Sequence, residues 1–486
     1  MNMLFRVRRI GTTSIHNQVR EHIVAAILGG SLLPEQKMPS TRELAISLRV
    51  SRNTIVQVYE RLAADGYLSV RDRAGYFVNC EAKTGWVRPE KKGQQPPARQ
   101  SVWTRKLKFH PSRQPYIRTP LNSHSYPYPF IYGQTDPSLF PISEWRECSR
   151  LALARSEVLE WTGDAIHQDD PTLIEQICSK LLPRRGIIAT PDQVLITMGA
   201  QNALYLAATL LASSKTTVGI ENPGYSDIRN AFIREEARIL PIDVDAEGLV
   251  IDDRLRDCNL VYLTPSHQYP TNVTLPLHRR EALLASAAEH DFLIIEDDYE
   301  NETNFVTQPI PALKSLDEGN RVLYASSLSK SMFPGLRIGY MVGPADFVAE
   351  ARALRRQMYR HPPANNQRTT SIFISLGYYD SHIRRLREAL RERWGMMKEA
   401  LAEFIPEAST AATAGGTSFW MQGPTSLDAQ KLADAALARG VVIEPGKDLF
   451  YGSHEPSNFF RLGVSSIPTD RIRPGIEILG KTLRSI

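Results

Sequence analysis

The first 80 residues carry three short segments whose apolar side chains repeat at helical spacing. Residues 14–28 place apolar side chains every three or four positions and end at a Gly-Gly pair. Residues 40–48 and 51–64 each open with a serine, which is a good helix N-cap. Residues 67–78 instead form two short apolar runs around a turn that contains glycine. Three helices followed by a hairpin predict a winged helix-turn-helix.

The third predicted helix and the hairpin offer side chains suited to DNA. A recognition helix meets base edges near its N-terminal end through hydroxyl, amide and guanidinium groups, and arginines elsewhere reach phosphates. Taken singly, each candidate is also compatible with an ordinary solvated position, whereas the set together favours DNA binding. The candidates are Arg42, Ser51, Arg52, Asn53, Thr54, Gln57, Arg71 and Arg73.

From residue 126 onward, helical and strand patterns alternate to the end of the chain. Such alternation predicts an α/β domain built on a largely parallel sheet. Residues 81–125 lose periodicity and are rich in Pro, Gln, Ser, Lys and Arg, which is typical of a linker. We therefore expect a DNA-binding domain at residues 10–80, a basic linker at 81–125 and an α/β domain at 126–486.

The overall charge of +5 conceals an asymmetry along the chain. Residues 1–113 hold about 20 Lys and Arg against 8 Asp and Glu, so this part carries about +12 and the remainder about −7. A basic N-terminal part joined to an acidic remainder is typical of a nucleic-acid-binding module joined to another domain. The four cysteines are widely spaced, and the sequence shows neither a signal peptide nor an apolar run of the roughly 20 residues that a membrane span requires. We expect a cytoplasmic protein without a metal site.

A single lysine, Lys330, follows a strand-like apolar run and lies among serines, with Arg337 a short distance further on. A lysine amine forms an imine with the aldehyde of pyridoxal 5'-phosphate (PLP), while Ser hydroxyls and an Arg fork bind phosphate. Two other interpretations of this stretch remain open. One is an ordinary solvated lysine. The other is the S-x-x-K motif of penicillin-binding enzymes, although its S-D-N companion motif is missing from this chain.

A second chemical signal is the acidic run Glu296-Asp297-Asp298, which ends the apolar strand predicted at residues 292–295. A buried carboxylate at such a place keeps the PLP ring nitrogen protonated, as the cofactor needs in order to act as an electron sink. Tyr299 follows directly and is suited to hydrogen-bond the phenolic oxygen of the cofactor. By itself, the run is equally compatible with a metal site or a solvated acidic turn.

Two further strand ends complete the pattern. The strand at residues 194–197 runs into Gly199, and a helix opens at Ala200 and Gln201. The free backbone N–H groups at such a helix start can bind phosphate. Another strand ends in a turn that carries Tyr225, which offers an aromatic ring at the carboxyl edge of the sheet.

The stretches Pro39–Ala45, Val50–Thr54 and Leu62–Leu68 together resemble the GntR family of bacterial repressors. The resemblance covers residues 10–80. It implies that Arg42, Ser51, Arg52 and the wing around Gly75 face operator DNA.

Residues 126–486 resemble the fold type I aminotransferases through motifs such as Asn222-Pro223-Gly224-Tyr225, Ser327–Lys330 and Phe460–Gly463. The resemblance implies that Lys330 forms the Schiff base with PLP, that Asp297 pairs with the ring nitrogen and that Tyr225 stacks on the ring. It assigns a ligand carboxylate to Arg461. The residues that it implies for the cofactor phosphate are Ala200, Gln201, Ser327, Ser329 and Arg337.

Two stretches depart from the common aminotransferase pattern. Tyr269-Pro270-Thr271-Asn272 stands where many relatives have Asn-Pro-Thr-Gly, so the usual Asn contact with the cofactor oxygen is in question, and Gln268 or Tyr269 is a candidate to replace it. Residues 161–171 replace a Gly-rich stretch that tends to shape the ligand pocket in relatives, which leaves room for an unusual effector.

A GntR-type reader joined to an aminotransferase-like domain resembles the MocR/GabR family of PLP-dependent transcriptional regulators. The resemblance implies a cytoplasmic, head-to-tail homodimer. In it, a small amino compound displaces Lys330 from PLP, forms an external aldimine and changes operator binding. Two alternatives remain: an active aminotransferase that carries a DNA-binding domain, and a repressor whose large domain has lost the cofactor.

Overall fold

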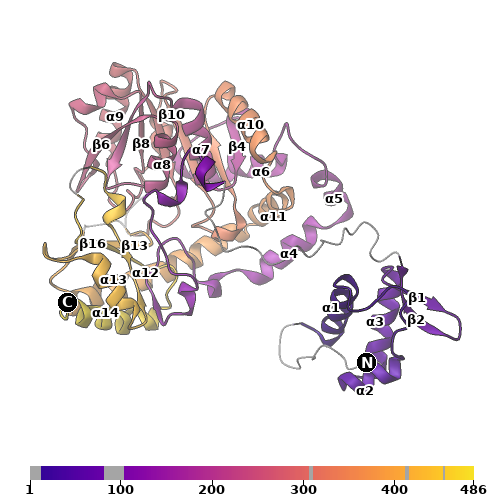
Figure 1. Cartoon of the computed structure of the whole chain (residues 1–486). Helices are drawn as coiled ribbons and strands as arrows, with labels where there is room; N and C mark the ends of the chain where they lie inside the picture. Colours follow the sequence, from indigo (N-terminus) through magenta and orange to yellow (C-terminus); the bar gives the residue numbers. More distant parts are fainter. Residues whose placement is uncertain (1–12, 81–102, 306–309, 411–414, 453–454) are drawn as a thin grey trace. The chain divides into compact units, whose positions relative to one another are not determined.

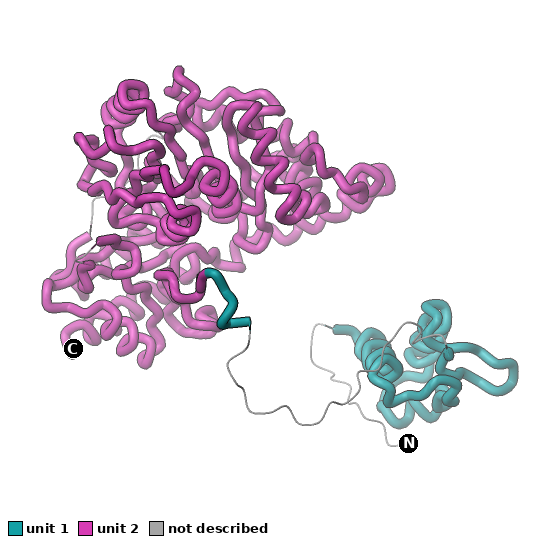
Figure 2. The backbone as a smooth tube through the Cα atoms, turned by 45° about the horizontal axis from the view of Figure 1, so that its top comes forward, with its two compact units in different colours: residues 1–108 teal, residues 109–486 magenta. Residues whose placement is uncertain are grey.

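The computed structural model describes residues 13–80, 103–305, 310–410, 415–452 and 455–486. The chain divides into two compact units, residues 1–108 and residues 109–486 (Figure 2). Each unit has its own hydrophobic core. Among the described helices, none combines the length and the apolar character that crossing a bilayer requires.

The small unit contains three helices and a two-stranded antiparallel hairpin, as the sequence predicts (Figure 1). Its core is formed by apolar residues from all three helices and both strands, including Ile23, Ile55 and Leu68. The winged helix-turn-helix prediction is confirmed. The elements are α1 (Ile15–Leu28), α2 (Thr41–Leu48), α3 (Arg52–Ala64), β1 (Leu68–Arg71) and β2 (Gly75–Val78).

Serine caps determine where α2 and α3 begin. The Ser40 hydroxyl accepts a hydrogen bond from the backbone N–H of Glu43 at 3.2 Å, and the Glu43 carboxylate accepts one from the backbone N–H of Ser40 at 2.9 Å. The Ser51 hydroxyl accepts a bond from the backbone N–H of Thr54 at 3.1 Å. These bonds satisfy N–H groups that have no partner inside the helix, so both helices start at the predicted positions.

The large unit is built on an eight-stranded mixed sheet with the strand order β4-β11-β10-β9-β8-β5-β6-β7. Its central strands, from β10 to β6, pair in parallel, while β11 and β7 run antiparallel to their neighbours. The predicted largely parallel sheet is therefore confirmed. The strands are β4 (Val194–Thr197), β5 (Thr217–Asn222), β6 (Arg238–Asp245), β7 (Gly248–Leu249), β8 (Leu260–Leu263), β9 (Leu293–Asp298), β10 (Val322–Ser327) and β11 (Gly339–Val342).

Helices cover both faces of this sheet. On one face, α7 (Ala200–Leu211), α8 (Ser226–Arg234) and α10 (Ala345–Tyr359) pack against alternate strand residues such as Val218. On the other face, α9 (Leu277–His290) belongs to a cluster with the neighbouring strand residues. With both faces covered, the central strands are apolar along most of their length, and polar side chains collect where the strands end.

A smaller C-terminal part adds a four-stranded antiparallel sheet with the order β12-β13-β16-β15. A further pair, β3 and β14, is parallel. These strands are β3 (Tyr128–Pro129), β12 (Ser409–Thr410), β13 (Ser418–Gln422), β14 (Val441–Val442), β15 (Glu444–Pro445) and β16 (Phe459–Gly463). The remaining α-helices are α4 (Ile142–Ala152), α5 (Arg155–Trp161), α6 (Pro171–Gln176), α11 (Ala364–Ser375), α12 (Tyr378–Phe404), α13 (Ala429–Leu437) and α14 (Thr469–Leu483).

The predicted linker is divided by the structure. Residues 81–102 lie outside the described residues, whereas residues 109–125 belong to the large unit. Asn230 on α8 donates a hydrogen bond to the backbone carbonyl of Pro115 at 2.9 Å, and the Arg234 guanidinium lies 5.8 Å from the ring centroid of Phe109. The large unit thus begins before residue 126, because this irregular segment packs against α8.

Candidate functional site

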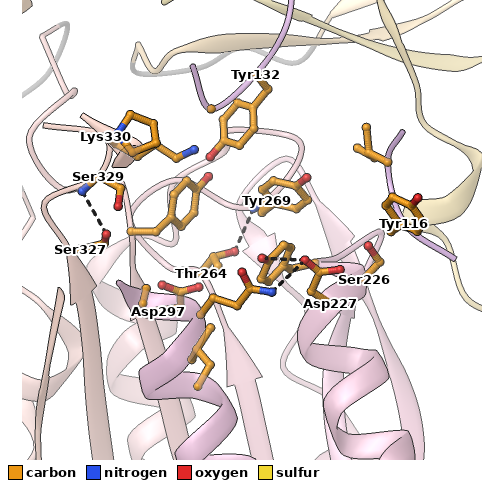
Figure 3. Close-up of a pocket in the computed structure, with 18 of the residues that line it drawn as sticks. Tyr116, Tyr132, Ser226, Asp227, Thr264, Tyr269, Asp297, Ser327, Ser329 and Lys330 are labelled. Carbon is orange, nitrogen blue, oxygen red and sulfur yellow. Dashed lines mark hydrogen bonds between the residues drawn. The ribbon is translucent and has the colours of Figure 1, made fainter. Parts of the chain in front are cut away.

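A cavity of about 410 Å³ opens at the carboxyl ends of β5, β8, β9 and β10. It is the place where strand order and chain direction bring the predicted residues together, although they come from separate strands, helices and loops (Figure 3). All ten residues predicted for the cofactor and its ligand line it. They are Ala200, Gln201, Tyr225, Asp297, Tyr299, Ser327, Ser329, Lys330, Arg337 and Arg461.

The amine of Lys330 points into this cavity toward Tyr132 (Figure 3). Its Nζ lies 4.2 Å from the centroid of the Tyr132 ring. Burial lowers the pKa of Lys330 to about 8, and the negative charge of Glu300 acts in the opposite direction. A neutral amine is the form that attacks an aldehyde, so near neutral pH a larger share of Lys330 is reactive than of an ordinary lysine.

Gly133 lies directly beside this amine. Its φ is +78°, and a Cβ at this position would lie 2.6 Å from Nζ of Lys330. A larger residue would therefore strain the backbone and force the Lys330 amine to move.

Asp297 lies near the end of β9 and is fully enclosed. Its Oδ2 accepts a hydrogen bond of 2.9 Å from the hydroxyl of Tyr262 on β8. Its Oδ1 is buried and has no hydrogen-bond partner among the described residues. Burial raises the pKa of Asp297 to about 7, and the Tyr262 hydrogen bond works against that rise. The free oxygen is suited to a protonated ring nitrogen, whose positive charge would stabilise the ionised carboxylate.

The three adjacent carboxylates of the acidic run have separate partners. Glu296 accepts hydrogen bonds from the backbone N–H groups of Leu313 and Lys314, each at 2.8 Å. Asp298 forms a buried ion pair with Arg185 at 2.7 Å. No group of side chains that could hold a metal ion occurs among the described residues. Alternation along β9 places Asp297 on one face of the sheet and Glu296 and Asp298 on the other.

The other end of the cavity is arranged for an anion. Helix α7 begins at Ala200, directly after Gly199, whose φ is +79°. Nη2 of Arg337 donates to the backbone carbonyl of Met198 at 2.7 Å, which holds the guanidinium beside this helix start. Ser329 Oγ is buried and has no partner among the described residues. Helix N–H groups, a guanidinium and a free hydroxyl together suit a phosphate.

Tyrosine rings form the remaining walls. Tyr225 donates from its hydroxyl to Oδ2 of Asp227 at 3.1 Å, and Gln201 donates to the same oxygen at 3.2 Å. The Tyr225 and Tyr269 ring centroids lie 5.2 Å apart. The Tyr299 hydroxyl is buried and has no hydrogen-bond partner among the described residues, so it is available to a ligand.

Of the two candidates to replace the usual Asn, only Tyr269 is among the described residues that line the cavity. The Gln268 amide donates instead to the backbone carbonyls of Pro223 and Tyr269, at 2.9 and 2.6 Å. It therefore ties two loops together. Residues 161–171 do not appear among the described lining residues of this chain.

These residues fit PLP. Three buried polar atoms around the cavity lack a partner among the described residues: Asp297 Oδ1, the Tyr299 hydroxyl and Ser329 Oγ. They are of the kinds that would bind a ring nitrogen, a phenolic oxygen and a phosphate, which are groups of PLP. Buried polar groups are normally hydrogen-bonded, so three such atoms around one cavity point to a ligand.

Sequence reasoning missed several lining residues: Tyr116, Ile117, Tyr132, Asp227, Tyr262, Thr264 and Glu444. The sequence does contain a signal for Tyr262, because this tyrosine lies near the end of an apolar strand, where site residues collect. Tyr132 and Glu444 had none, since they come from segments far from every recognised motif.

In the small unit, most of the DNA-binding candidates lie exposed. These exposed side chains are Arg42, Ser51, Arg52, Asn53, Gln57, Arg71 and Arg73, together with Gly75. Thr54 is partly buried, and its hydroxyl lies 2.8 Å from that of Ser51. Arg71 forms an ion pair with Glu35 and lies over the Phe77 ring, 4.3 Å from its centroid. The candidates thus occupy α2, the start of α3 and the wing, where a winged helix meets DNA.

Comparisons with known proteins agree with this two-part architecture. The family "Bacterial regulatory proteins, gntR family" matches residues 15–78, and "Aminotransferase class I and II" matches residues 148–479. The HTH-type transcriptional regulator TauR of Rhodobacter capsulatus is 44% identical over 98% of this chain and 97% of its own length. The probable rhizopine catabolism regulatory protein MocR of Rhizobium meliloti is 30% identical over 96% of this chain and 93% of that protein. The chain belongs to the MocR family of transcriptional regulators.

The large unit of this MocR-family regulator is similar to solved aminotransferases. One is a Pyrococcus horikoshii kynurenine aminotransferase in complex with PMP, with a TM-score of 0.69 and 28% identity over 73% of this chain and 90% of that one. Another is LysN, an α-aminoadipate aminotransferase from Thermus thermophilus complexed with N-(5'-phosphopyridoxyl)-L-leucine, with a TM-score of 0.67 and 28% identity over 73% of this chain and 92% of that one. The fold type I aminotransferase prediction is confirmed. The protein is a transcriptional regulator with an aminotransferase-like domain.

Proposed function

We propose that this regulator holds PLP on Lys330 and senses a small amino compound that competes with Lys330 for it. The observation that carries the proposal is the single cavity that collects Lys330, Asp297 and Arg461 in a chain with a GntR-type reader. When bound, PLP supplies an aldehyde that reacts reversibly with primary amines.

The residues of the chain have distinct tasks in this proposal. Lys330 provides the resident amine, Asp297 holds the ring nitrogen and Tyr225 covers the ring. The phosphate is held by Ala200, Gln201, Ser327, Ser329 and Arg337. Arg461 takes the acid group of the effector, whose amine then lies close to Lys330.

The segment that follows the linker connects the cavity to the DNA-binding unit along the chain. Tyr116, Ile117 and Thr119 line the cavity, and the DNA-binding unit directly precedes this segment in the chain. A change in DNA binding requires that the effector bind two arrangements of the chain with different affinities, and we assign that difference to its contacts with this segment. A coupling of about 1 to 3 kcal/mol would change operator affinity roughly 5- to 150-fold. We place this switch in a cytoplasmic, head-to-tail homodimer.

Visible absorbance tests the proposal. Purified wild type and Lys330→Ala would be supplied with PLP and titrated with amino compounds, while binding to operator DNA is followed in the same samples. We expect a yellow band that requires Lys330, shifts with one class of amine and changes DNA affinity over the same concentrations. Protein that stays colourless with PLP would contradict the proposal. Turnover of a keto acid at about 1 per second or faster would show a working aminotransferase instead.

A further inference from the structure

A buried ion pair forms one wall of the cavity. Nε of Arg461 donates to Oε2 of Glu444 at 3.0 Å, and the backbone N–H of Tyr132 donates to the same oxygen at 3.3 Å. Only 2% of the Arg461 side chain and 4% of the Glu444 side chain are exposed. Glu444 on β15 and Arg461 on β16 are direct cross-strand partners. The pair is therefore fixed by the register of the sheet.

This pairing determines which edge of Arg461 a ligand can use. The guanidinium lies 3.9 Å from the ring centroid of Tyr132 and 4.7 Å from that of Tyr269. Its Nη1 is buried and has no partner among the described residues. A guanidinium offers parallel N–H groups to a carboxylate either along the Nε side or at its terminal end. Glu444 occupies the Nε side, and the Tyr269 hydroxyl also interacts with the guanidinium, so a ligand carboxylate must use the terminal end beside Tyr269.

The pair also changes the charge that a ligand meets. The cations among the described lining residues are Lys330, Arg337 and Arg461. Under the proposed function, PLP engages the first two, and Glu444 neutralises the third. One acid group of an effector gains the open end of Arg461. A second acid group would meet no further cation among the described lining residues, whereas the carboxylates of Glu444 and Asp227 line the same cavity. Like charges placed together disfavour such a ligand.

We propose that Glu444 is a specificity-determining residue of the effector site, which selects amino compounds with one acid group and rejects those with two. This inference rests on the proposed function. It assigns to Glu444 the repulsive part of recognition, while Arg461 supplies the attractive part.

The test uses two pairs of amines whose members differ by one carboxylate. β-Alanine is compared with L-aspartate, and γ-aminobutyrate with L-glutamate, by titration of the visible absorbance of full-length, PLP-loaded protein. We expect wild type to prefer the singly acidic member of at least one pair by about tenfold or more. Glu444→Gln keeps an acceptor for Nε of Arg461 and removes the charge, so we expect it to reduce that preference about tenfold. Glu444→Asp, which keeps the charge, should retain the preference.

A matched control is Glu477→Gln, which removes the same charge from an exposed ion pair with Lys481 on α14. It should leave the preference unchanged. Wild type that responds equally to both members of each pair, or a Glu444→Gln protein that keeps the wild-type ratio, would overturn the role of Glu444 alone. If Glu444→Gln does not fold, equal responses of wild type to both members of each pair still overturn the inference, and Glu444→Asp still has to retain the preference. A wild type that responds to no amine would instead overturn the proposed function, and this inference with it.

Discussion

The hydroxyl of Tyr262 on β8 donates a hydrogen bond to Asp297 on β9, across 2.9 Å. The bond uses Oδ2 and leaves the buried Oδ1 open to the cavity. It also counteracts the burial that raises the pKa of Asp297 to about 7. Tyr262 therefore positions the carboxylate and favours its charged form.

The variant Tyr262→Phe removes this donor without changing the ring. We expect the pKa of Asp297 to rise further above 7, so a larger share of the carboxyl is protonated at neutral pH and holds the ring nitrogen of PLP less well. A hydrogen bond to a charged group contributes about 1.5 to 3 kcal/mol, which corresponds to a loss of PLP affinity of roughly tenfold or more.

Absorbance titration with PLP at two pH values checks the cause. The deficit of Tyr262→Phe should be larger near pH 7 than near pH 9, because at the higher pH Asp297 is ionised in both proteins. An equal deficit at both pH values would mean that the pKa of Asp297 is not involved. Tyr378→Phe is the matched control, since its hydroxyl donates to Glu147 at 2.8 Å on the protein surface.

Gly133→Ala tests the space beside Lys330. The new Cβ would lie 2.6 Å from Nζ, so the amine must move, and we expect a loss of PLP binding by about tenfold or more. Gly377→Ala is a close control because Gly377 also has a positive φ, +77°, but no atom within 4 Å of an added Cβ. Both variants should lose about 1 kcal/mol of folding stability in thermal unfolding. Similar PLP affinity in the two variants would contradict the steric explanation.

The rate at which apo protein takes up PLP should depend on the pKa of Lys330. That pKa is about 8, lowered from the ordinary 10.5 by burial, and the neutral amine is the reactive form. The uptake rate should therefore rise with pH up to about 8 and then level off. Stopped-flow absorbance between about pH 6 and 10 measures this profile. A rate that continues to rise toward pH 10 would show that the amine has an ordinary pKa.

The two wing arginines should differ in their contributions to DNA binding. Arg71 is paired with Glu35, whereas none of the ion pairs found among the described residues involves Arg73. We expect Arg73→Ala to reduce the slope of log affinity against log salt by about 1, between about 50 and 200 mM salt, because one phosphate contact is lost. Arg71→Ala should have a smaller effect, since this arginine must first leave its carboxylate partner.

Fluorescence anisotropy with a short DNA duplex measures both slopes. Arg61→Ala provides a control at the other end of α3, where Arg61 lies 3.6 Å from Asp65. A larger effect of Arg71→Ala than of Arg73→Ala would show that DNA replaces Glu35 at little cost.

Local chemistry explains why so much of the fold could be predicted. The Ser40 and Ser51 caps and the glycines after α1 and α3 are interactions within a few residues, so the sequence itself contains the boundaries of the small unit. The apolar runs of β8 and β10 are equally direct signals, because a strand that is covered on both faces is apolar along most of its length. The segment at residues 109–125 lacked any such signal, because its packing against α8 depends on irregular backbone contacts.

The sequence by itself determined the two fold classes and the ten residues that line the proposed cofactor and ligand site, because these residues lie near strand ends and helix starts with recognisable local chemistry. Only the tertiary structure decided what surrounds them. Tyr262 reaches Asp297 through strand pairing, and Glu444 reaches Arg461 through cross-strand register. Tyr132 contacts both Lys330 and Arg461, although it lies about 200 and 330 positions away from them in the chain. Such contacts arise from packing across the whole unit, and no local pattern in the chain encodes them.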